Sequence, residues 1–288
     1  MAKFKTFTLQ DFDRQFPDDD ACLDHLMKVR YGHRFPCPRC AREATFYRRV
    51  ARPAYTCEFC GHDINPMAGT LFHRSHAALR KWFYAMYLFA MSRHGVPARE
   101  LQRQLGVTLK TAWRMGHEIR KYMAAVDGDD DLSGHVEVDE TMIGGRRKGG
   151  KRGRGAPGKT IVFGMLERAG NVMTRVVANV RRVTLEAVIL EKIAFGATIS
   201  TDELRSYAKL SRHGYRHATV NHSADEYVRG SVHVNGMEGF WSQVKRSIRG
   251  THIHVSARHL PKYLGEFEFR YNLRKAPHLM LPRLVASF

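Results

Sequence analysis

Two pairs of cysteines constrain the fold of this chain more than any other feature of its sequence. The pairs are Cys37-Pro-Arg-Cys40 and Cys57-Glu-Phe-Cys60, and 16 residues separate them. This spacing is typical of a structural zinc site, in which two turns each present two thiolates to one tetrahedral ion. We therefore predict that the four cysteines hold one structural Zn²⁺, which folds this module and takes no part in chemistry. Four buried free cysteines or a redox pair are the alternative interpretations.

The charge of the chain indicates a polyanionic partner. Lys and Arg number 47 against 28 Asp and Glu, which gives a formal net charge of +19. An anionic membrane surface would attract the same charge. However, the longest nearly uninterrupted apolar stretch, Trp82–Met91, is about half of the roughly 20 residues that a spanning helix needs. Near the N-terminus, acidic residues at 11, 13 and 18–20 stand where a secretory signal would need an apolar core. We therefore expect a soluble intracellular protein.

The hydrophobic pattern divides the chain into segments of different secondary structure. Residues 1–30 have helical spacing, residues 31–75 are rich in loops and cysteines, and the chain is helical again from residue 76 to about residue 123. After a polar linker at 127–131, strands alternate with helices, and this order predicts an α/β domain with a mixed sheet. The predicted strands are 135–139, 160–166, 172–177, 197–200 and 218–220, with helices at 185–193 and 235–288. The predicted domains are residues 1–75, 76–126 and 132–288.

Residues 98–120 have the pattern of a helix-turn-helix motif. Leu101 and Leu105 would face inward on the first helix. Gly106 would make the turn, and Thr108 would cap the second helix. The second helix would pack through Ala112, Trp113 and Met115 or Ile119, and it would expose near a major groove the side chains of Lys110, Thr111, Arg114 and His117. A purely structural helical hairpin is the alternative, because any hairpin with a glycine turn has a similar pattern.

Three carboxylates in the last domain are candidates for a catalytic metal site. Asp139 ends the first predicted strand, Asp202 follows the strand at 197–200, and Glu238 lies at the start of a long helix. Between Asp202 and Glu238 there are 35 residues, and Lys245 lies seven residues beyond Glu238 on the same helix face. Carboxylates clustered in this way can hold two Mg²⁺ ions for in-line phosphoryl transfer. Each residue alone has an ordinary structural role, such as a strand-end turn or a helix N-terminus.

The combination of these residues resembles the DDE transposases of bacterial insertion sequences, most closely the insertion-sequence XO-two-like group. The strings that carry the resemblance are Val138-Asp-Glu-Thr-Met-Ile-Gly-Gly145, Ser200-Thr-Asp-Glu-Leu204 with Tyr207, His233-Val-Asn-Gly-Met-Glu-Gly-Phe-Trp-Ser242 with Lys245, and His259-Leu-Pro-Lys-Tyr-Leu-Gly-Glu-Phe-Glu-Phe-Arg-Tyr-Asn272. The predicted zinc ribbon and Gly69-Thr-Leu-Phe-His73 agree with the same group. The resemblance therefore covers nearly the whole chain.

The resemblance implies a ribonuclease H-like catalytic fold that binds two Mg²⁺ or Mn²⁺ ions. It makes Asp139, Asp202 and Glu238 the catalytic metal ligands, and it makes Lys245 a DNA contact near the active site. Asn235 lies one helical turn before Glu238 and is a candidate auxiliary ligand, because relatives in the broader family can have Asn as the third residue.

The implied function is that of a DNA transposase. Such an enzyme binds double-stranded DNA at the terminal inverted repeats of an insertion sequence, cleaves the ends and joins their 3′-hydroxyls to target DNA. The resemblance further implies a homodimer or larger assembly on DNA, in the bacterial cytoplasm and associated with the nucleoid. A nuclease or resolvase without strand transfer, and a domesticated DNA-binding regulator without catalysis, are the alternatives.

A glycine-rich basic segment follows the strand that carries Asp139. Residues 146–159 contain seven basic residues, five glycines and no acidic residue. Such a segment can adapt to a phosphate backbone without reading its sequence, whereas a solvated loop without contacts is the alternative. The candidate DNA contacts are Arg146, Arg147, Lys148, Lys151, Arg152 and Arg154. On the later helix, Phe240 and Trp241 are expected to belong to the core.

Overall fold

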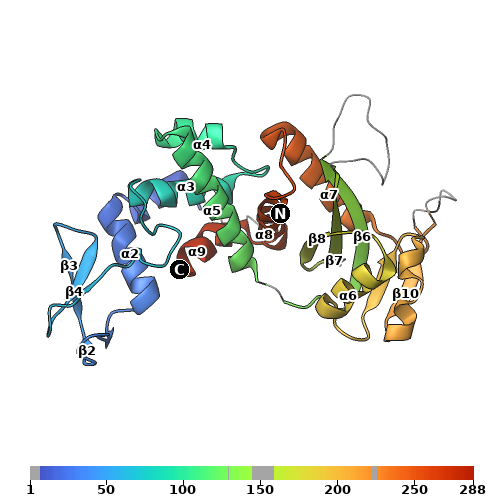
Figure 1. The fold of residues 1–288 in the computed structure, drawn as a ribbon, viewed down its shortest axis with the longest axis horizontal. Helices are drawn as coiled ribbons and strands as arrows, with labels where there is room; N and C mark the ends of the chain where they lie inside the picture. The colour runs from blue at the N-terminus through green and yellow to red at the C-terminus, as the bar shows by residue number, and fades with distance from the viewer. Residues whose placement is uncertain (1–6, 129, 145–158, 222–225, 227) are drawn as a thin grey trace. The chain divides into compact units, whose positions relative to one another are not determined.

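The computed structural model describes residues 7–128, 130–144, 159–221, 226 and 228–288 (Figure 1). The chain packs as two compact units. The first contains the residues up to Tyr122 together with Lys275–Phe288, and the second contains Met123–Arg274. The boundary after Tyr122 precedes the polar linker that the sequence predicted at 127–131. No helix in the described part of the chain is long and apolar enough to span a membrane.

The first unit begins with two capped helices. Helix α1 (Leu9–Gln15) starts after Thr8, whose hydroxyl accepts the Asp11 N–H while the Asp11 carboxylate accepts the Thr8 N–H. Helix α2 (Asp19–Tyr31) starts after Asp18, whose carboxylate accepts a backbone N–H of the first turn. These caps satisfy backbone donors that a helix start leaves without partners, and they set both helices where the sequence predicted helical structure.

Short antiparallel strands flank the turns that hold the two cysteine pairs, and Cys57 is the last residue of one of them. The strands are β1 (Phe35–Pro36), β2 (Glu43–Ala44), β3 (Phe46–Arg49), β4 (Ala54–Cys57) and β5 (Asp63–Ile64). β1 pairs with β2, and β4 pairs with both β3 and β5. The rings of Phe35 and Phe46 stack with their centroids 4.4 Å apart, so an aromatic contact joins the two ladders.

Three longer helices follow the cysteine-bearing strands. They are α3 (Leu79–Met91), α4 (Ala98–Leu105) and α5 (Leu109–Asp127). α4 ends at Gly106, whose left-handed φ of 58° is a conformation that favours glycine. The Thr108 hydroxyl then accepts a backbone N–H in the first turn of α5 at 3.2 Å. The two helices and the glycine turn expected at 98–120 are therefore present.

The C-terminal segment packs with the first unit. Helix α9 (Met280–Ala286) contacts α3. The Tyr122 hydroxyl donates a hydrogen bond to the Leu284 carbonyl at 3.0 Å, and the Phe288 ring stacks on the Tyr122 ring with centroids 5.5 Å apart. The sequence-based boundaries assigned residues 275–288 to the last domain, and the structure differs because these contacts hold them in the first unit.

The second unit is built on a five-stranded mixed sheet in the order β10-β9-β6-β7-β8 (Figure 1). β6, β7 and β8 are antiparallel, β9 runs parallel to β6, and β10 runs parallel to β9. The strands are β6 (His135–Gly144), β7 (Lys159–Glu167), β8 (Val172–Val177), β9 (Thr198–Thr201) and β10 (Arg216–Thr219). The predicted mixed sheet is confirmed. The first strand is longer than expected, because its ladder with β7 continues past Asp139.

Helices cover both faces of this sheet. Alternate residues of β7 enter different cores, so that Phe163 packs with α6 (Arg182–Lys192) whereas Val162 packs with the other face. That other face is covered by α7 (Asn235–Ser247) and α8 (Leu260–Asn272). The sheet is therefore buried between two helical layers.

Helix α7 packs directly on the sheet beside Asp139. Gly164 of β7 lies opposite Asp139 in the antiparallel ladder. A Cβ atom at Gly164 would lie 2.4 Å from both Met237 Cε and Trp241 Cζ2, which is too close for any side chain. The absence of a side chain thus lets α7 approach the sheet at this point. Trp241 and Phe240 are buried in this core, as predicted.

Candidate functional site

Two parallel strands bring Asp139 and Asp202 to the same level of the sheet. The register of β6 and β9 pairs Glu137 with Ser200, so the positions two residues further on, Asp139 and Asp202, are level at the carboxyl end of β9. One oxygen from each of Asp139, Glu140 and Asp202 lies within 4.8 Å of the others. The structure therefore brings together the first two carboxylates that the sequence singled out.

Other negative charges of this cluster act on Asp139. Burial, followed by the negative charges of Glu140 and Asp202, raises the pKa of Asp139 to about 7. A divalent cation would relieve this repulsion, and carboxylate oxygens are the ligands that Mg²⁺ and Mn²⁺ prefer. The cluster therefore fits a hard divalent ion.

Glu140 is a member of the cluster that the sequence did not suggest. Adjacent residues of a strand point to opposite faces, so a pattern-based argument separates Glu140 from Asp139. The Tyr207 hydroxyl donates a hydrogen bond to Glu140 Oε2 at 2.7 Å, and the Tyr207 ring is fully buried in the core beneath α6. Tyr207 therefore anchors Glu140 at the edge of the acidic cluster.

Helix α7 brings Glu238 and Lys245 into electrostatic contact with Asp139. The negative charge of Glu238 contributes to the raised pKa of Asp139. Burial lowers the pKa of Lys245, and the charge of Asp139 opposes that fall. Glu238 does not belong to the described group whose oxygens all lie within 4.8 Å of one another. Asn235 is exposed at the first position of α7, one turn before Glu238.

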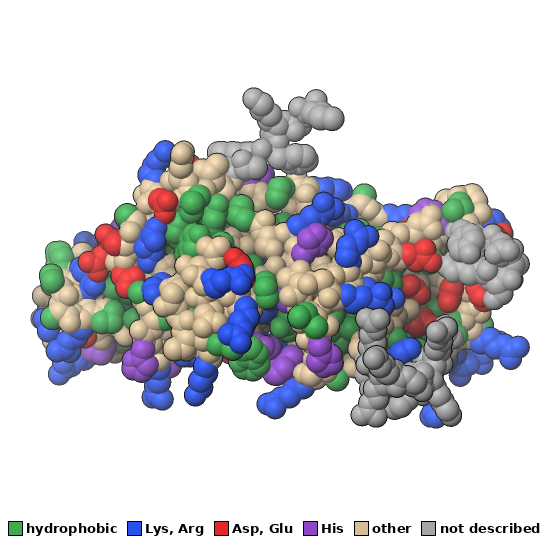
Figure 2. Space-filling view, turned by 90° about the horizontal axis from the view of Figure 1, so that it is seen from above, with side chains coloured by type: hydrophobic (Ala, Val, Ile, Leu, Met, Phe, Trp, Pro, Cys, Tyr) green, Lys and Arg blue, Asp and Glu red, His purple; other side chains and the backbone are tan. Residues whose placement is uncertain are grey.

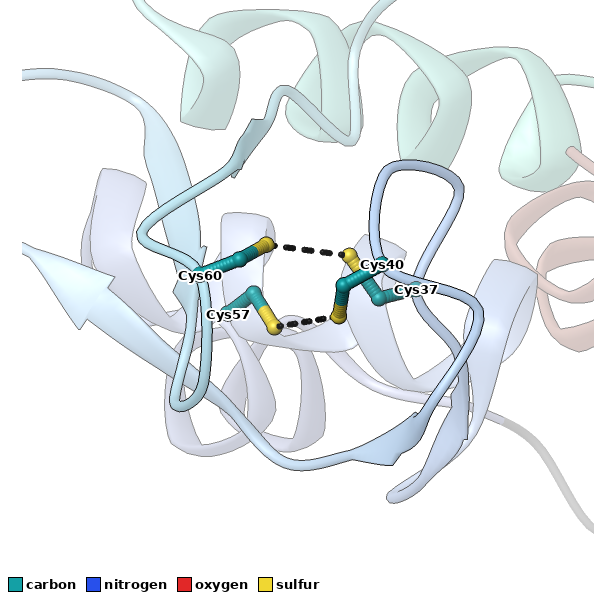
Figure 3. Close-up of side chains that lie close together, drawn as sticks. All are labelled: Cys37, Cys40, Cys57 and Cys60. Atoms are coloured by element: carbon teal, nitrogen blue, oxygen red, sulfur yellow. Dashed lines mark hydrogen bonds between the residues drawn. The ribbon is translucent and has the colours of Figure 1, made fainter.

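The four predicted zinc ligands converge on one point (Figure 3). The Sγ atoms of Cys37 and Cys60 are 3.6 Å apart, and those of Cys40 and Cys57 are 3.9 Å apart. A tetrahedral zinc ion with Zn–S bonds of about 2.3 Å separates its sulfurs by about 3.8 Å. The arrangement therefore fits one structural zinc ion with four thiolate ligands.

The exposed face of α5 differs in part from the sequence-based prediction. Lys110 and Arg114 are exposed and Thr111 is half-buried. Trp113, which was expected in the core, is 48% exposed, and His117, which was expected at the surface, is 4% exposed. The two rings pack with their centroids 4.0 Å apart. The correction follows from helix geometry, because the inward face is taken by Ala112, Met115 and Ile119.

Lys and Arg outnumber Asp and Glu in this chain by 47 to 28. Figure 2 shows Lys and Arg side chains spread over the face that it displays rather than gathered in one patch. Of the basic segment that the sequence singled out, all residues except Lys159 lie outside the described residues, and these include the candidate contacts Arg146, Arg147, Lys148, Lys151, Arg152 and Arg154.

Comparison with known proteins identifies two regions of the chain. Residues 131–272 match the ISXO2-like transposase domain, and residues 17–63 match the transposase zinc-ribbon domain. An uncharacterized protein in the transposable element ISH50 of Halobacterium salinarum is 29% identical over 287 residues, which cover 92% of this chain and 94% of that protein.

Two solved structures of Mos1 also show similarity to this chain. For a strand transfer complex the TM-score is 0.31 and the sequence identity is 14%. The alignment covers 66% of this chain and 72% of the Mos1 chain. For a pre-cleavage transpososome the TM-score is 0.28 and the sequence identity is again 14%. The alignment covers 66% of this chain and 73% of the Mos1 chain. The family assignment rests on the two matched domains, which together span about two thirds of the sequence, and on the relative in ISH50: the chain belongs to the ISXO2-like transposases with an N-terminal zinc ribbon.

Proposed function

We propose that the second unit is a ribonuclease H-like catalytic domain that cleaves DNA and joins the new ends to a target. The strand order supports this fold, because three antiparallel strands are continued by two parallel strands in one sheet with helices on both faces. The observation that carries the proposal is the meeting of Asp139 and Asp202 at the carboxyl end of β9, with Glu238 and Lys245 on the adjacent helix.

In this proposal, Asp139, Asp202 and Glu238 hold two Mg²⁺ or Mn²⁺ ions, with Glu140 within reach of the same site and Asn235 as a candidate auxiliary ligand. When bound, the ions supply activation of the attacking oxygen and stabilisation of the leaving oxygen in phosphoryl transfer. Because burial and neighbouring negative charges raise the pKa of Asp139 to about 7, this carboxyl group is partly protonated near neutral pH, and metal binding would favour its ionised form. Metal binding and proton release are therefore coupled at Asp139.

Lys245 has the position and charge of a phosphate contact. Its side chain is half-buried, and the carboxylate of Asp139 favours its protonated form. An ammonium group in such a place would bind a phosphate oxygen next to the bond being broken, where partial burial strengthens the interaction. We therefore assign Lys245 to holding the scissile phosphate rather than to metal binding.

The first unit is proposed to recognise the terminal inverted repeats. The exposed side chains of Lys110 and Arg114, with Thr111 between them in the sequence, are suited to the major groove, which an α-helix can enter. The basic residues at 146–154 would add contacts to the phosphate backbone that do not depend on sequence. Double-stranded DNA at the transposon ends and at the target is thus the proposed partner.

The assembly is proposed to be a homodimer or larger on DNA, acting in the bacterial cytoplasm at the nucleoid. Two transposon ends must be cut and joined together, so one active site for each end requires at least two protomers. A zinc ion held by the four cysteines would stabilise the zinc-ribbon part of the first unit.

The test separates DNA binding from cleavage. The Asp139→Asn and Asp202→Asn variants should lose cleavage of a labelled duplex carrying the element's own ends by at least about a hundredfold, because each removes a charge that holds the ions. Both should bind the same duplex nearly as tightly as the unaltered chain. The matched control is Glu191→Gln on α6, which also removes one carboxylate but from an exposed ion pair with Arg175.

Substantial residual cleavage in both aspartate variants would contradict the metal assignment. Cleavage by the unaltered chain without a joined product would instead favour a nuclease or resolvase. Tight binding with neither reaction would indicate a DNA-binding regulator, in which Asp139→Asn changes nothing measurable.

A further inference from the structure

Glu137 is a buried carboxylate on the strand that carries Asp139. Its side chain is 2% exposed. Because it lies two residues before Asp139 in β6, both side chains point to the sheet face that α7 covers. Glu137 does not belong to the acidic cluster of Asp139, Glu140 and Asp202. Its carboxylate instead accepts hydrogen bonds from donors on other parts of the chain.

One oxygen of Glu137 caps the helix that carries Glu238. The residue before α7, Val234, has no side chain that can accept a hydrogen bond from the helix start. Instead, Glu137 Oε2 accepts the backbone N–H of Met237 at 3.0 Å. This is the bond that an Asp or Ser normally supplies from the chain just before a helix. Here a strand supplies it, so the start of α7 is attached to β6.

The other oxygen of Glu137 is attached to the same region through Arg168. Arg168 Nε donates to Glu137 Oε1 at 2.9 Å, and its other nitrogens donate to the carbonyls of Ser231 at 2.5 Å and His233 at 3.0 Å. His233 Nδ1 also lies 3.1 Å from Glu137 Oε1. The segment that leads into α7 is thus fixed to β6 by one carboxylate and one guanidinium.

The close approach leaves no room for a side chain at Gly236. A Cβ atom there would lie 2.8 Å from Glu137 Oε2 and 3.3 Å from Leu166 Cδ2. The glycine in the Asn235-Gly-Met-Glu238 string therefore has a packing reason, which is the passage of the helix start over the Glu137 carboxylate.

We propose that Glu137, held by Arg168, is a positioning residue that sets where α7 places Glu238 relative to Asp139. The connection is short, because Glu137 is two residues from Asp139 and its hydrogen-bond partner Met237 is adjacent to Glu238. Removing the carboxylate frees the first turn of α7 and spreads the carboxylates that would share the metal ions. This role rests on the proposed function of the Asp139 site.

Two measurements test this role in the full chain. Glu137→Ala should weaken Mn²⁺ binding, followed by titration, by about 10–100-fold, since groups that orient metal ligands have effects of this size. It should also speed hydrogen exchange at the Met237 amide, while the affinity for duplex DNA stays unchanged. Glu137→Gln keeps an oxygen for the Met237 N–H and should restore part of both losses. Gly236→Ala should change both quantities in the same direction as Glu137→Ala.

Glu266→Gln is the matched control, because Glu266 is fully buried and ion-paired with Arg270 within α8. It should lower the melting temperature without changing Mn²⁺ affinity or exchange at Met237. The positioning role is overturned if Glu137→Ala keeps the original Mn²⁺ affinity and Met237 protection, or if the control loses as much of either. If the unaltered chain binds no Mn²⁺, the proposed function fails, and exchange at Met237 alone decides whether Glu137 holds α7.

Discussion

Asp139 combines the properties that a metal-binding carboxylate needs. It is largely buried, it is level with Asp202 across a parallel strand pair, and the carboxylates of Glu140 and Glu238 act on it. Without a cation these groups repel one another. The site is therefore arranged at a cost to the stability of the metal-free chain.

This repulsion predicts a pH-dependent effect of Asp139→Asn on the metal-free chain. Because the folded pKa of about 7 is above that of an unfolded Asp, ionisation costs stability progressively from about pH 4 to pH 7 and fully above pH 7. The variant should therefore be more stable than the unaltered chain at pH 8 by about 1 kcal/mol or more, and nearly equal to it at pH 4. The corresponding rise in melting temperature is about 2–4 °C per kcal/mol.

Thermal unfolding in the presence of a chelator, repeated from pH 4 to pH 8, checks this expectation. Adding Mg²⁺ or Mn²⁺ should reverse the order, because only the unaltered chain gains stability by binding the ion. A difference that does not grow with pH would show that Asp139 titrates as an ordinary surface aspartate.

At the same scale, the sequence singled out Asp139 and Asp202 because each is a carboxylate beside an apolar strand, and the structure brings the two side chains together. It could not locate Glu140, since the geometry that brings Glu140 close depends on the buried Tyr207, 67 residues away in the sequence. Nor could it assign a role to Glu137, whose partners Arg168 and Met237 lie on other elements. Such contacts come from the tertiary fold and not from local pattern.

At the scale of single elements, helix α5 shows what periodicity can and cannot predict. Its inward face was predicted through Ala112, Trp113 and Met115 or Ile119, and Ala112, Met115 and Ile119 are all fully buried. Trp113 was predicted to pack on this inward face with them. The structure instead exposes it, since its position on the helix is turned away from that face.

An exposed Trp between Lys110 and Arg114 predicts a contribution to DNA recognition. Trp113→Ala should weaken binding to the terminal-repeat duplex by about tenfold, a value within the usual range for one lost contact. It should leave the melting temperature of the protein nearly unchanged, because 48% of the side chain is already exposed.

Fluorescence anisotropy with repeat and scrambled duplexes measures this effect. The control is Phe195→Ala, which removes another exposed aromatic side chain, 85% exposed, from the second unit. Equal affinity of the Trp113 variant and the unaltered chain for the repeat duplex would show that Trp113 takes no part in recognition.

The cysteine-bearing strands form an element whose ladders are short, with two to four residues in each strand. Such strands bury little surface, so their fold should depend on the metal. Metal analysis should find one tightly held zinc per chain, and Cys37→Ser with Cys40→Ser should abolish it and reduce binding to the terminal repeats. A purified chain without zinc that still binds the repeats would refute the zinc ribbon.

At the scale of the whole molecule, the order of secondary structure was enough to predict an α/β unit with a mixed sheet after a zinc-bearing and helical region. The grouping of the C-terminal residues was not predictable, because it depends on contacts such as that of Phe288 with Tyr122, which are 166 positions apart. The formal charge of +19 agrees with a nucleic-acid partner at this scale but does not identify the sequence that is bound.

In the proposed function, this chain uses the Asp139 site to join transposon ends to target DNA. The most direct measurement is incubation of the purified chain with labelled DNA carrying the element's ends, a target plasmid and Mg²⁺ or Mn²⁺. We expect a joined product that requires the divalent ion and disappears in Asp139→Ala. A joined product that persists in Asp139→Ala, or none with the unaltered chain although it binds the ends, would show that the proposed function is wrong.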